Sequence, residues 1–171
     1  MQSSNDRTQI ATTLARARAL LDAGQFGEAA KLARNLLEEV PADARAWRLM
    51  SAVHLRGDRV DQATLCLQRA MACDPDDVTT MIQLGQCLAR LARRREALAI
   101  ADHVAGLPLD RPALDDGLGT LFRHCDEPLR ALPFFERAVA CMPESSDYLY
   151  NLSTAQTWSA ISWRLKPALG A

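Results

Sequence analysis

The chain has 171 residues, of which 49% are hydrophobic, and this length and composition are sufficient for one domain with a buried core. Its 20 basic and 21 acidic side chains give a net charge of −1, which excludes bulk attraction to nucleic acid or to an anionic membrane. No apolar run approaches the ~18 residues of a membrane-spanning helix. From the charge we expect no nucleic-acid partner, and from the charge and the missing apolar run we expect no membrane partner.

The N-terminal residues lack the basic start and the apolar stretch of a secretory signal, so the expected compartment is the cytoplasm. Alanine, leucine and arginine dominate the composition and favour helices over strands. The cysteines form no C-x-x-C pair, and no histidine lies at zinc-like spacing from two of them. We therefore expect no metal site and no cofactor, and interpret most of these cysteines as small buried hydrophobic residues.

Small residues and prolines recur along the chain at an interval of 34 residues. One series consists of Ala29, Ala63, Ala97 and Ala131, and a second of Ala17, Ser51, Gly85, Gly119 and Ser153. Prolines follow at Pro41, Pro75 and Pro143, with Pro108 one residue early. This period predicts helix–turn–helix units stacked in an array, in which the small residues give two helices room to cross closely.

The period predicts a single domain over 1–171, with units at 10–43, 44–77, 78–111 and 112–145. In the second unit, the apolar spacing predicts helices near 43–56 and 60–73, with Gly57 and Asp58 at the turn between them. Gly24 marks the corresponding turn of the first unit, whereas the turn of the third unit, at 92–95, contains no glycine. A capping helix at about 146–165 is expected to end the array.

The pattern resembles the tetratricopeptide repeat family over roughly residues 10–156. The resemblance rests on the small–alanine–proline series, on Trp47 with Gly57, on Leu84 with Gly85, and on the segment ALPFFERAVACMP at 131–143. It implies an all-α, right-handed superhelical solenoid of about four antiparallel helix pairs plus the capping helix. It also implies a concave groove, lined by the first helix of each pair, that binds a protein or peptide partner.

If the first helices line this groove, their polar positions supply the candidate binding residues. These are Arg18, Arg45, Arg48, Arg56, Gln83, Gln86, Arg90, Arg123 and Asn151, with Asp116, Thr120, Tyr150 and Thr154 beside them. Arginine binds carboxylates through two parallel hydrogen bonds, and amide side chains bond an extended backbone, so an acidic or C-terminal peptide segment is the expected ligand. The alternative is that these arginines form an ordinary solvated surface in an arginine-rich chain.

Catalytic chemistry is not expected from this chain. His54, His103 and His124 lie in three different units, and His54 occupies an inward position at which a core histidine is expected. The adjacent His124 and Cys125 could form a reactive pair, although a simple helix terminus is the preferred interpretation. No phosphate-binding glycine motif or nucleophile motif occurs, and the run 93–95 of three arginines is interpreted as a solvated turn.

Three further hypotheses remain open from the sequence. Trp158, Ile161 and Leu165 share one face of the last helix, which suggests a homodimer formed through this helix. The segment around 114–156 is similar to the repeat region that precedes a sulfotransferase domain in some bacterial proteins, so the chain could be the non-catalytic N-terminal region of such an enzyme. A cytosolic secretion chaperone would suit the size and the repeat content as well.

Overall fold

The computed structural model describes the backbone of residues 2–165 and the side chains of residues 8–160. Over this range the regular elements are α1 (Gln2–Asp22), α2 (Phe26–Glu39), α3 (Ala44–Arg56), α4 (Val60–Cys73), α5 (Val78–Arg90), α6 (Arg94–Ala105), α7 (Pro112–His124), α8 (Pro128–Cys141) and α9 (Ser146–Leu165). None of the described residues forms a strand, and the all-α prediction is confirmed. The helices predicted near 43–56 and 60–73 are α3 and α4.

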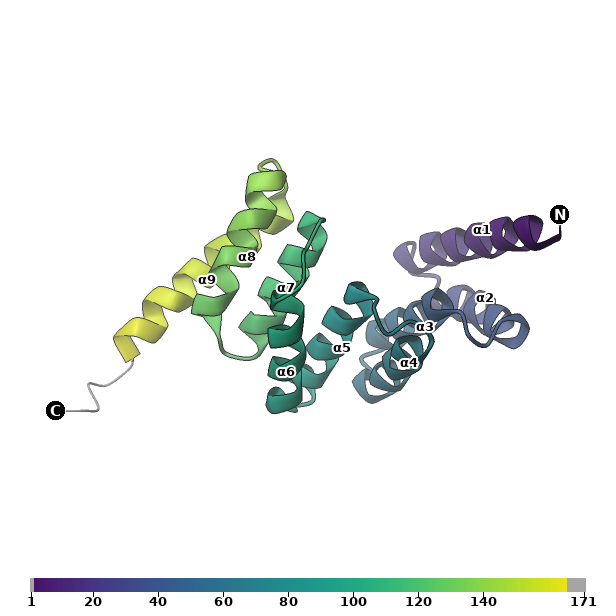
Figure 1. The fold of residues 1–171 in the computed structure, drawn as a ribbon, viewed down its shortest axis with the longest axis horizontal. Coiled ribbons are helices and arrows are strands. Elements are labelled where there is room, and N and C mark those ends of the chain that lie inside the picture. Colours follow the sequence, from purple (N-terminus) through teal and green to yellow (C-terminus); the bar gives the residue numbers. More distant parts are fainter. Residues whose placement is uncertain (1, 166–171) are drawn as a thin grey trace. The chain divides into compact units, whose positions relative to one another are not determined.

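The chain divides into two compact units, Met1–Thr80 and Met81–Ala171, and the division falls in the first turn of α5. In the first unit α1 packs against α2 and α3, α2 packs against α3, and α3 packs against α4. In the second unit α6 packs against α7, α7 against α8, and α8 against α9 (Figure 1). Short turns join these neighbours, so each unit is a stack of consecutive helical hairpins.

Each unit has its own buried core. A cluster in the first unit contains Ala17, Leu21, Ala29, Ala33, Leu49 and Val53. The largest fully buried apolar side chains of the second unit include Val104, Leu118, Leu121, Phe122 and Phe135. These residues recur at the apolar positions of the repeat, so the packing is the consequence of the helical periodicity of the sequence.

Close helix crossings explain the small residues of the repeat. All four alanines of the first series are completely buried. A Cβ atom on Gly119 would lie 2.8 Å from Cε1 of Phe135 on α8, and a Cβ atom on Gly85 would lie 2.6 Å from Cδ2 of Leu121 on α7. Both separations are too short for carbon atoms, so the predicted clearance within a hairpin is confirmed for Gly119, whereas Gly85 gives its closest clearance to the first helix of the next repeat.

The turns inside the four hairpins share one left-handed residue at the same repeat position. Gly24, Asp58, Ala92 and Asp126 have φ values of 77°, 54°, 58° and 57°. In each case the next residue donates its N–H to a carbonyl five residues earlier: Gln25 to Leu20, Arg59 to His54, Arg93 to Leu88, and Glu127 to Phe122. This bonding satisfies carbonyls at the end of the first helix. The third turn therefore has the geometry of the others although it contains no glycine.

A buried acid stands at one apolar position of the repeat. Asp115 on α7 is 5% exposed and occupies the position held by Trp47 in α3 and by Met81 in α5. Its Oδ1 accepts a hydrogen bond of 2.9 Å from Nε of Arg137 on α8. The Arg137 guanidinium also lies 4.7 Å from the centroid of the Phe134 ring. The ion pair links α7 to α8, and the cation–π contact, which lies within α8, holds the guanidinium in place.

The left-handed turn residues give a direct test of this geometry. Alanine pays about 1 kcal/mol for a left-handed conformation that glycine adopts freely, so Ala92→Gly should raise the free energy of unfolding by about that amount. Gly24→Ala should lower it similarly, because a Cβ atom there meets nothing within 4 Å and only the backbone conformation is penalised. Urea unfolding followed by circular dichroism measures both changes, and equal signs for the two variants would contradict the assignment.

Candidate functional site

The predicted groove residues divide between the two units. Arg18, Arg45, Arg48 and Arg56 belong to the first unit, on α1 and α3, whereas Gln83, Gln86, Arg90, Arg123 and Asn151 belong to the second unit, on α5, α7 and α9. The two sets differ in how their polar groups are already bonded.

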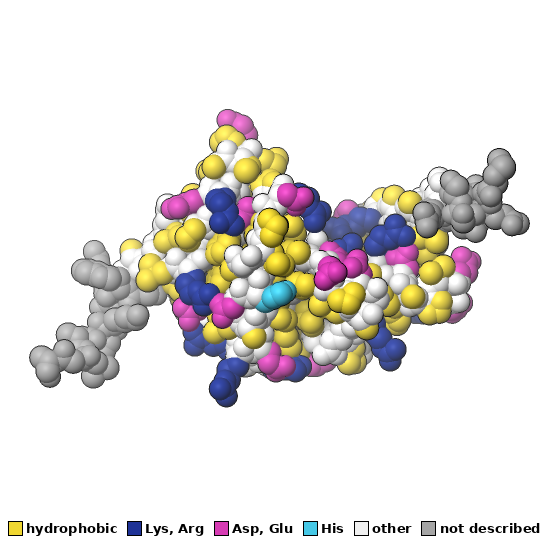
Figure 2. Space-filling view, viewed as in Figure 1, with side chains coloured by type: hydrophobic (Ala, Val, Ile, Leu, Met, Phe, Trp, Pro, Cys, Tyr) yellow, Lys and Arg dark blue, Asp and Glu magenta, His cyan; other side chains and the backbone are white. Residues whose placement is uncertain are grey.

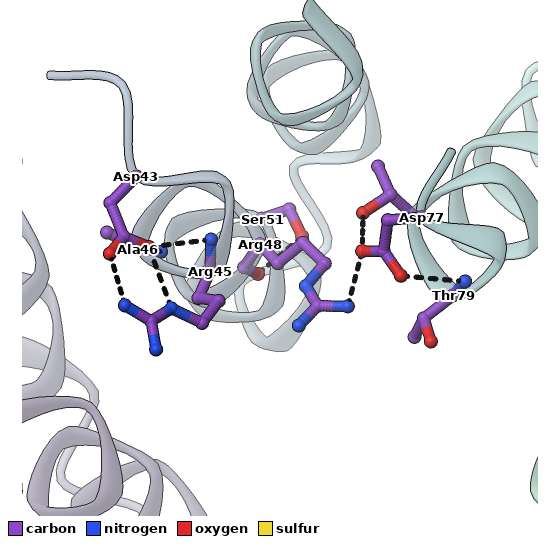
Figure 3. Close-up of polar contacts among 8 residues, drawn as sticks. Asp43, Arg45, Ala46, Arg48, Ser51, Asp77 and Thr79 are labelled. Carbon is purple, nitrogen blue, oxygen red and sulfur yellow. Dashed lines mark hydrogen bonds and ion pairs between the residues drawn. The ribbon is translucent and has the colours of Figure 1, made fainter. Parts of the chain in front are cut away.

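Arg45 is bound to its own helix terminus. Asp43 caps α3, because its Oδ1 accepts from the backbone N–H groups of Arg45 and Ala46 at 2.9 and 3.2 Å. The Arg45 guanidinium bonds both oxygens of the same carboxylate, at 3.2 and 2.7 Å (Figure 3). Burial opposes ionisation of Asp43, but the bonds from Arg45 and from the Ala46 N–H outweigh it and hold the Asp43 pKa below its usual value.

Arg48 joins α3 to the start of α5. Its Nη1 donates to Oδ2 of Asp77 at 2.6 Å, and both side chains are largely buried (Figure 3). The same carboxylate accepts from the hydroxyl of Thr80 and from the N–H of Thr79, so it closes the first turn of α5. Arg48 is therefore a structural cation. An Arg48→Glu substitution would place a second carboxylate against Asp77, and it is no clean probe of ligand binding.

The remaining arginines of the first-unit set are exposed. Arg18 lies 3.6 Å from Asp22 in a solvated pair of the same helix, with side chains 66% and 57% exposed. Arg56 is exposed at the end of α3. A solvated ion pair contributes little to stability. The first unit thus offers fewer uncommitted cations to a ligand than its arginine content indicates.

Five side chains of the second unit form a surface that we call the unit 2 polar face: Gln83 and Gln86 of α5, Asp116 and Arg123 of α7, and Asn151 of α9. Nε2 of Gln86 donates to the carbonyl oxygen of Gly117 at 2.9 Å. Nδ2 of Asn151 donates to Oδ1 of Asp116 at 2.8 Å. These two bonds connect α7 to the helices on either side of it, and they occupy one donor nitrogen of each amide side chain.

Two polar atoms of the unit 2 polar face are buried without a hydrogen-bond partner. They are Oε1 of Gln83 and Nε of Arg123. One is an acceptor and the other a donor, and leaving such atoms unpaired costs stability. Arg90, the remaining predicted residue, is exposed at the end of α5 and already takes part in a polar or electrostatic interaction.

Burial affects the acid at the centre of this face. It raises the pKa of Asp116 above its usual value, with Asp147 adding to the rise, while the Asn151 bond and the Arg123 charge oppose it. The phenol pKa of Tyr148 is raised as well, by burial and by the charges of Asp116 and Asp147. The face therefore disfavours further negative charge close to Asp116.

The residues considered for catalysis do not form a reactive site. Cys125 is completely buried, and burial raises the pKa of its thiol, which keeps it protonated. Burial lowers the pKa of the neighbouring His124, with Arg123 and Arg90 contributing, so this imidazole is neutral. His54 is half-buried as an inward residue, but its Nδ1 has no partner, and burial lowers its pKa. A helix terminus remains the better interpretation of the His124–Cys125 pair.

Sequence reasoning missed a cleft of about 520 Å³ between α1 and α2. Its lining consists of Gln9, Ile10, Thr13, Leu32, Asn35, Leu36, Glu39 and Val40. The signal was available, because Thr13 occupies the repeat position at which α3 carries the much larger Trp47. The lining mixes apolar and polar groups and contains a single ionisable side chain, Glu39.

Other kinds of site were sought over the described residues. Among them, no three histidine, cysteine or acidic side chains converge in a way that could hold a metal ion. No helix in that range combines the length and apolar character needed to cross a bilayer. On the face drawn in Figure 2, basic and acidic side chains are interspersed with hydrophobic ones.

The Asp116 environment predicts a pH-dependent stability effect. Because the folded-state pKa lies above the unfolded-state value, this carboxyl contributes stability below about pH 4 that is lost as the pH rises through the folded-state pKa. Asp116→Asn keeps an acceptor for Asn151 and removes the charge. We expect this variant to unfold at higher urea than the wild type at neutral pH, and the difference to shrink on acidification. A variant less stable at neutral pH would contradict the prediction.

Comparison with known proteins finds a family match over part of the chain. The family model described as tetratricopeptide repeat matches residues 20–79. Protein O-mannosyl-transferase TMTC1 of Mus musculus is 25% identical over 144 residues, which is 82% of this chain and 15% of that protein. The chain thus spans less than a sixth of the length of this relative.

Solved structures extend the similarity over most of the chain. TTC0263, a thermophilic TPR protein of Thermus thermophilus, superposes with a TM-score of 0.72 at 21% identity, covering 85% of this chain and 80% of that one. YrrB, described as a TPR protein with an unusual peptide-binding site, gives a TM-score of 0.60 at 18% identity, covering 92% and 79%. Residues 20–79 therefore match the tetratricopeptide repeat family, and the described residues share the all-α fold of solved tetratricopeptide repeat proteins.

Proposed function

We propose that the chain is a protein-interaction module whose unit 2 polar face binds an extended, acidic segment of another polypeptide. A tetratricopeptide repeat fold supports a role as a protein–protein interaction scaffold. The peptide-binding site that the name of the YrrB structure records supports the same class of ligand here. We propose no catalytic role for the chain itself. We propose that the partner polypeptide is cytosolic.

The observation that carries the proposal is the unpaired state of Gln83 Oε1 and Arg123 Nε. Both atoms are buried, so a ligand reaches them only after the two side chains turn outward; an extended backbone, with one N–H donor and one carbonyl acceptor in each peptide group, then supplies their complement. Binding would then recover hydrogen bonds that the free protein lacks. Side chains that already form hydrogen bonds within the protein, such as Arg48 and Gln86, have fewer free donors for a ligand.

The preference for acidic segments follows from the charges of the same face. Arg123 and Arg90 are cationic, and both act on the pKa of His124. The nearby acid, Asp116, opposes a ligand carboxylate at its own position, so we assign the acidic contact to the arginines. Arginine forms its strongest hydrogen bonds to carboxylates, so a glutamate or aspartate of the ligand beside Arg123 would gain most. Arg45 and Arg48 are already neutralised by Asp43 and Asp77, so we assign the preference to the second unit.

A peptide selection tests this proposal. Random peptides of about 12 residues, long enough in extended form to cross three packed helices, are displayed on phage and selected on the full chain. We expect enrichment of Asp and Glu. The best peptide is then synthesised in two forms, one with its Asp and Glu residues intact and one with Asn and Gln in their place. Fluorescence anisotropy measures the dissociation constant of each form. Arg123→Gln should weaken the acidic peptide about tenfold or more and the amide peptide little.

Two further variants separate binding from folding. Arg95→Gln, on the exposed surface of α6, is the matched control and should leave both affinities unchanged. Gln83→Leu copies Leu49, which stands one repeat earlier; it should stabilise the fold by removing a buried unpaired acceptor, and yet weaken both peptides. Selected peptides without acidic enrichment would reject the charge assignment, and unchanged binding by the Gln83 variant would reject the backbone contact.

A second candidate is that the chain is the repeat region of a larger transferase. Its support is the similarity to a mannosyl-transferase of which the chain spans 15%. In that case an antibody raised against the chain should detect a native protein much heavier than 18.8 kDa in a lysate of the source organism. A native band at the mass of the chain would argue against it.

A further inference from the structure

One face of α9 is exposed along its described length. The exposed side chains on this face are Ser146, Leu149, Tyr150, Ser153, Gln156, Thr157 and Ala160, and their spacing of three and four residues places them on one side of the helix. Asp147 and Trp158 are exposed on a different side. Leu149 is 45% and Tyr150 70% exposed. The sequence contains no charged residue between Tyr148 and Ala160. Exposed helix surfaces ordinarily carry charges, so an uncharged face with two large exposed side chains indicates a surface that another polypeptide covers.

The repeat register indicates what kind of element covers it. Ser153 corresponds to Ala17, Ser51, Gly85 and Gly119, and all four of these are buried. Gly119 lies beneath Phe135, on the antiparallel helix that follows α7. Leu149 corresponds to Met81 and Asp115, which are 8% and 5% exposed. In α7 this face is therefore the contact with the antiparallel helix α8, and on α9 it is exposed.

We propose that a second copy of this chain covers the face, with two α9 helices crossing antiparallel and Ser153 at the twofold axis. Such a pair repeats the antiparallel crossing of α7 and α8, which also has a small residue at its centre. Because the face is uncharged, pairing it with itself brings no like charges together. The twofold axis places Leu149 opposite Thr157 of the second copy. This inference does not rest on the proposed peptide site.

The sequence-based hypothesis of pairing through Trp158, Ile161 and Leu165 uses another face of α9. Trp158 is 56% exposed but lies five residues from Ser153, well away from the centre of the uncovered face. Ile161 and Leu165 lie outside the described side chains. The pairing surface is therefore defined by Ser153 with its neighbours Leu149, Gln156 and Ala160.

Charge variants at the twofold axis test the proposal. Sedimentation equilibrium of the full chain at about 100 µM should give a dimer. Ser153→Glu and Ser153→Lys each place like charges at the crossing and should weaken association at least tenfold when measured alone. An equimolar mixture of the two should associate again, because opposite charges then meet. Gln68→Glu, exposed on α4, is the matched control and should leave the association unchanged.

A monomeric wild-type chain at this concentration would overturn the proposal and leave the face to a different polypeptide. Unchanged association of both Ser153 variants, or a mixture that stays monomeric, would overturn the twofold crossing. Circular dichroism checks that each variant keeps its helicity. If a Ser153 variant unfolds, Gln156→Glu and Gln156→Lys on the same face replace the Ser153 variants. Association is then measured for each Gln156 variant alone and for their equimolar mixture.

Discussion

The close approach of a large side chain to a small residue on a neighbouring helix is the constraint on which the helix packing depends. At Gly119 a single additional carbon would collide with Phe135, and the alanine at the corresponding position of each second helix is completely buried. The larger side chains, such as Leu118 and Leu121, can fill the space beside the crossing only because the two backbones approach there. The 34-residue period therefore reflects one recurring steric contact.

The turns are a second recurring constraint, and they mark the limit of sequence prediction for this fold. Gly24 is identifiable from its type, because glycine adopts a left-handed conformation freely. Ala92 has the same conformation without any chemical signal, and only its distance of one period from Asp58 and Asp126 indicates it. Helix positions follow from apolar spacing, whereas the conformation of this turn is imposed by the packing of the two helices that it joins.

The candidate site was less predictable because its bonds connect different repeats. The pairing of Arg45 with Asp43 is local and could be anticipated from the capping position. Arg48 with Asp77, Gln86 with Gly117, and Asn151 with Asp116 are separated by 29, 31 and 35 residues. These separations are close to one period, so the neighbours of a polar residue on a first helix belong to the adjacent repeat. A list of arginines along one helix omits these partners and overstates the positive charge available to a ligand.

The same argument separates structural polar groups from those that a ligand can use. Where a side chain finds its partner one period away, as Arg48 does, the bond holds neighbouring repeats together and removing it should first affect stability. Where a buried atom finds none, as at Gln83 and Arg123, the repeat bears an energetic cost with no structural return. A ligand that completes such atoms gains affinity without displacing an existing bond. Incomplete bonding is thus a stronger indicator of a binding surface in a repeat protein than the number of charged residues on it.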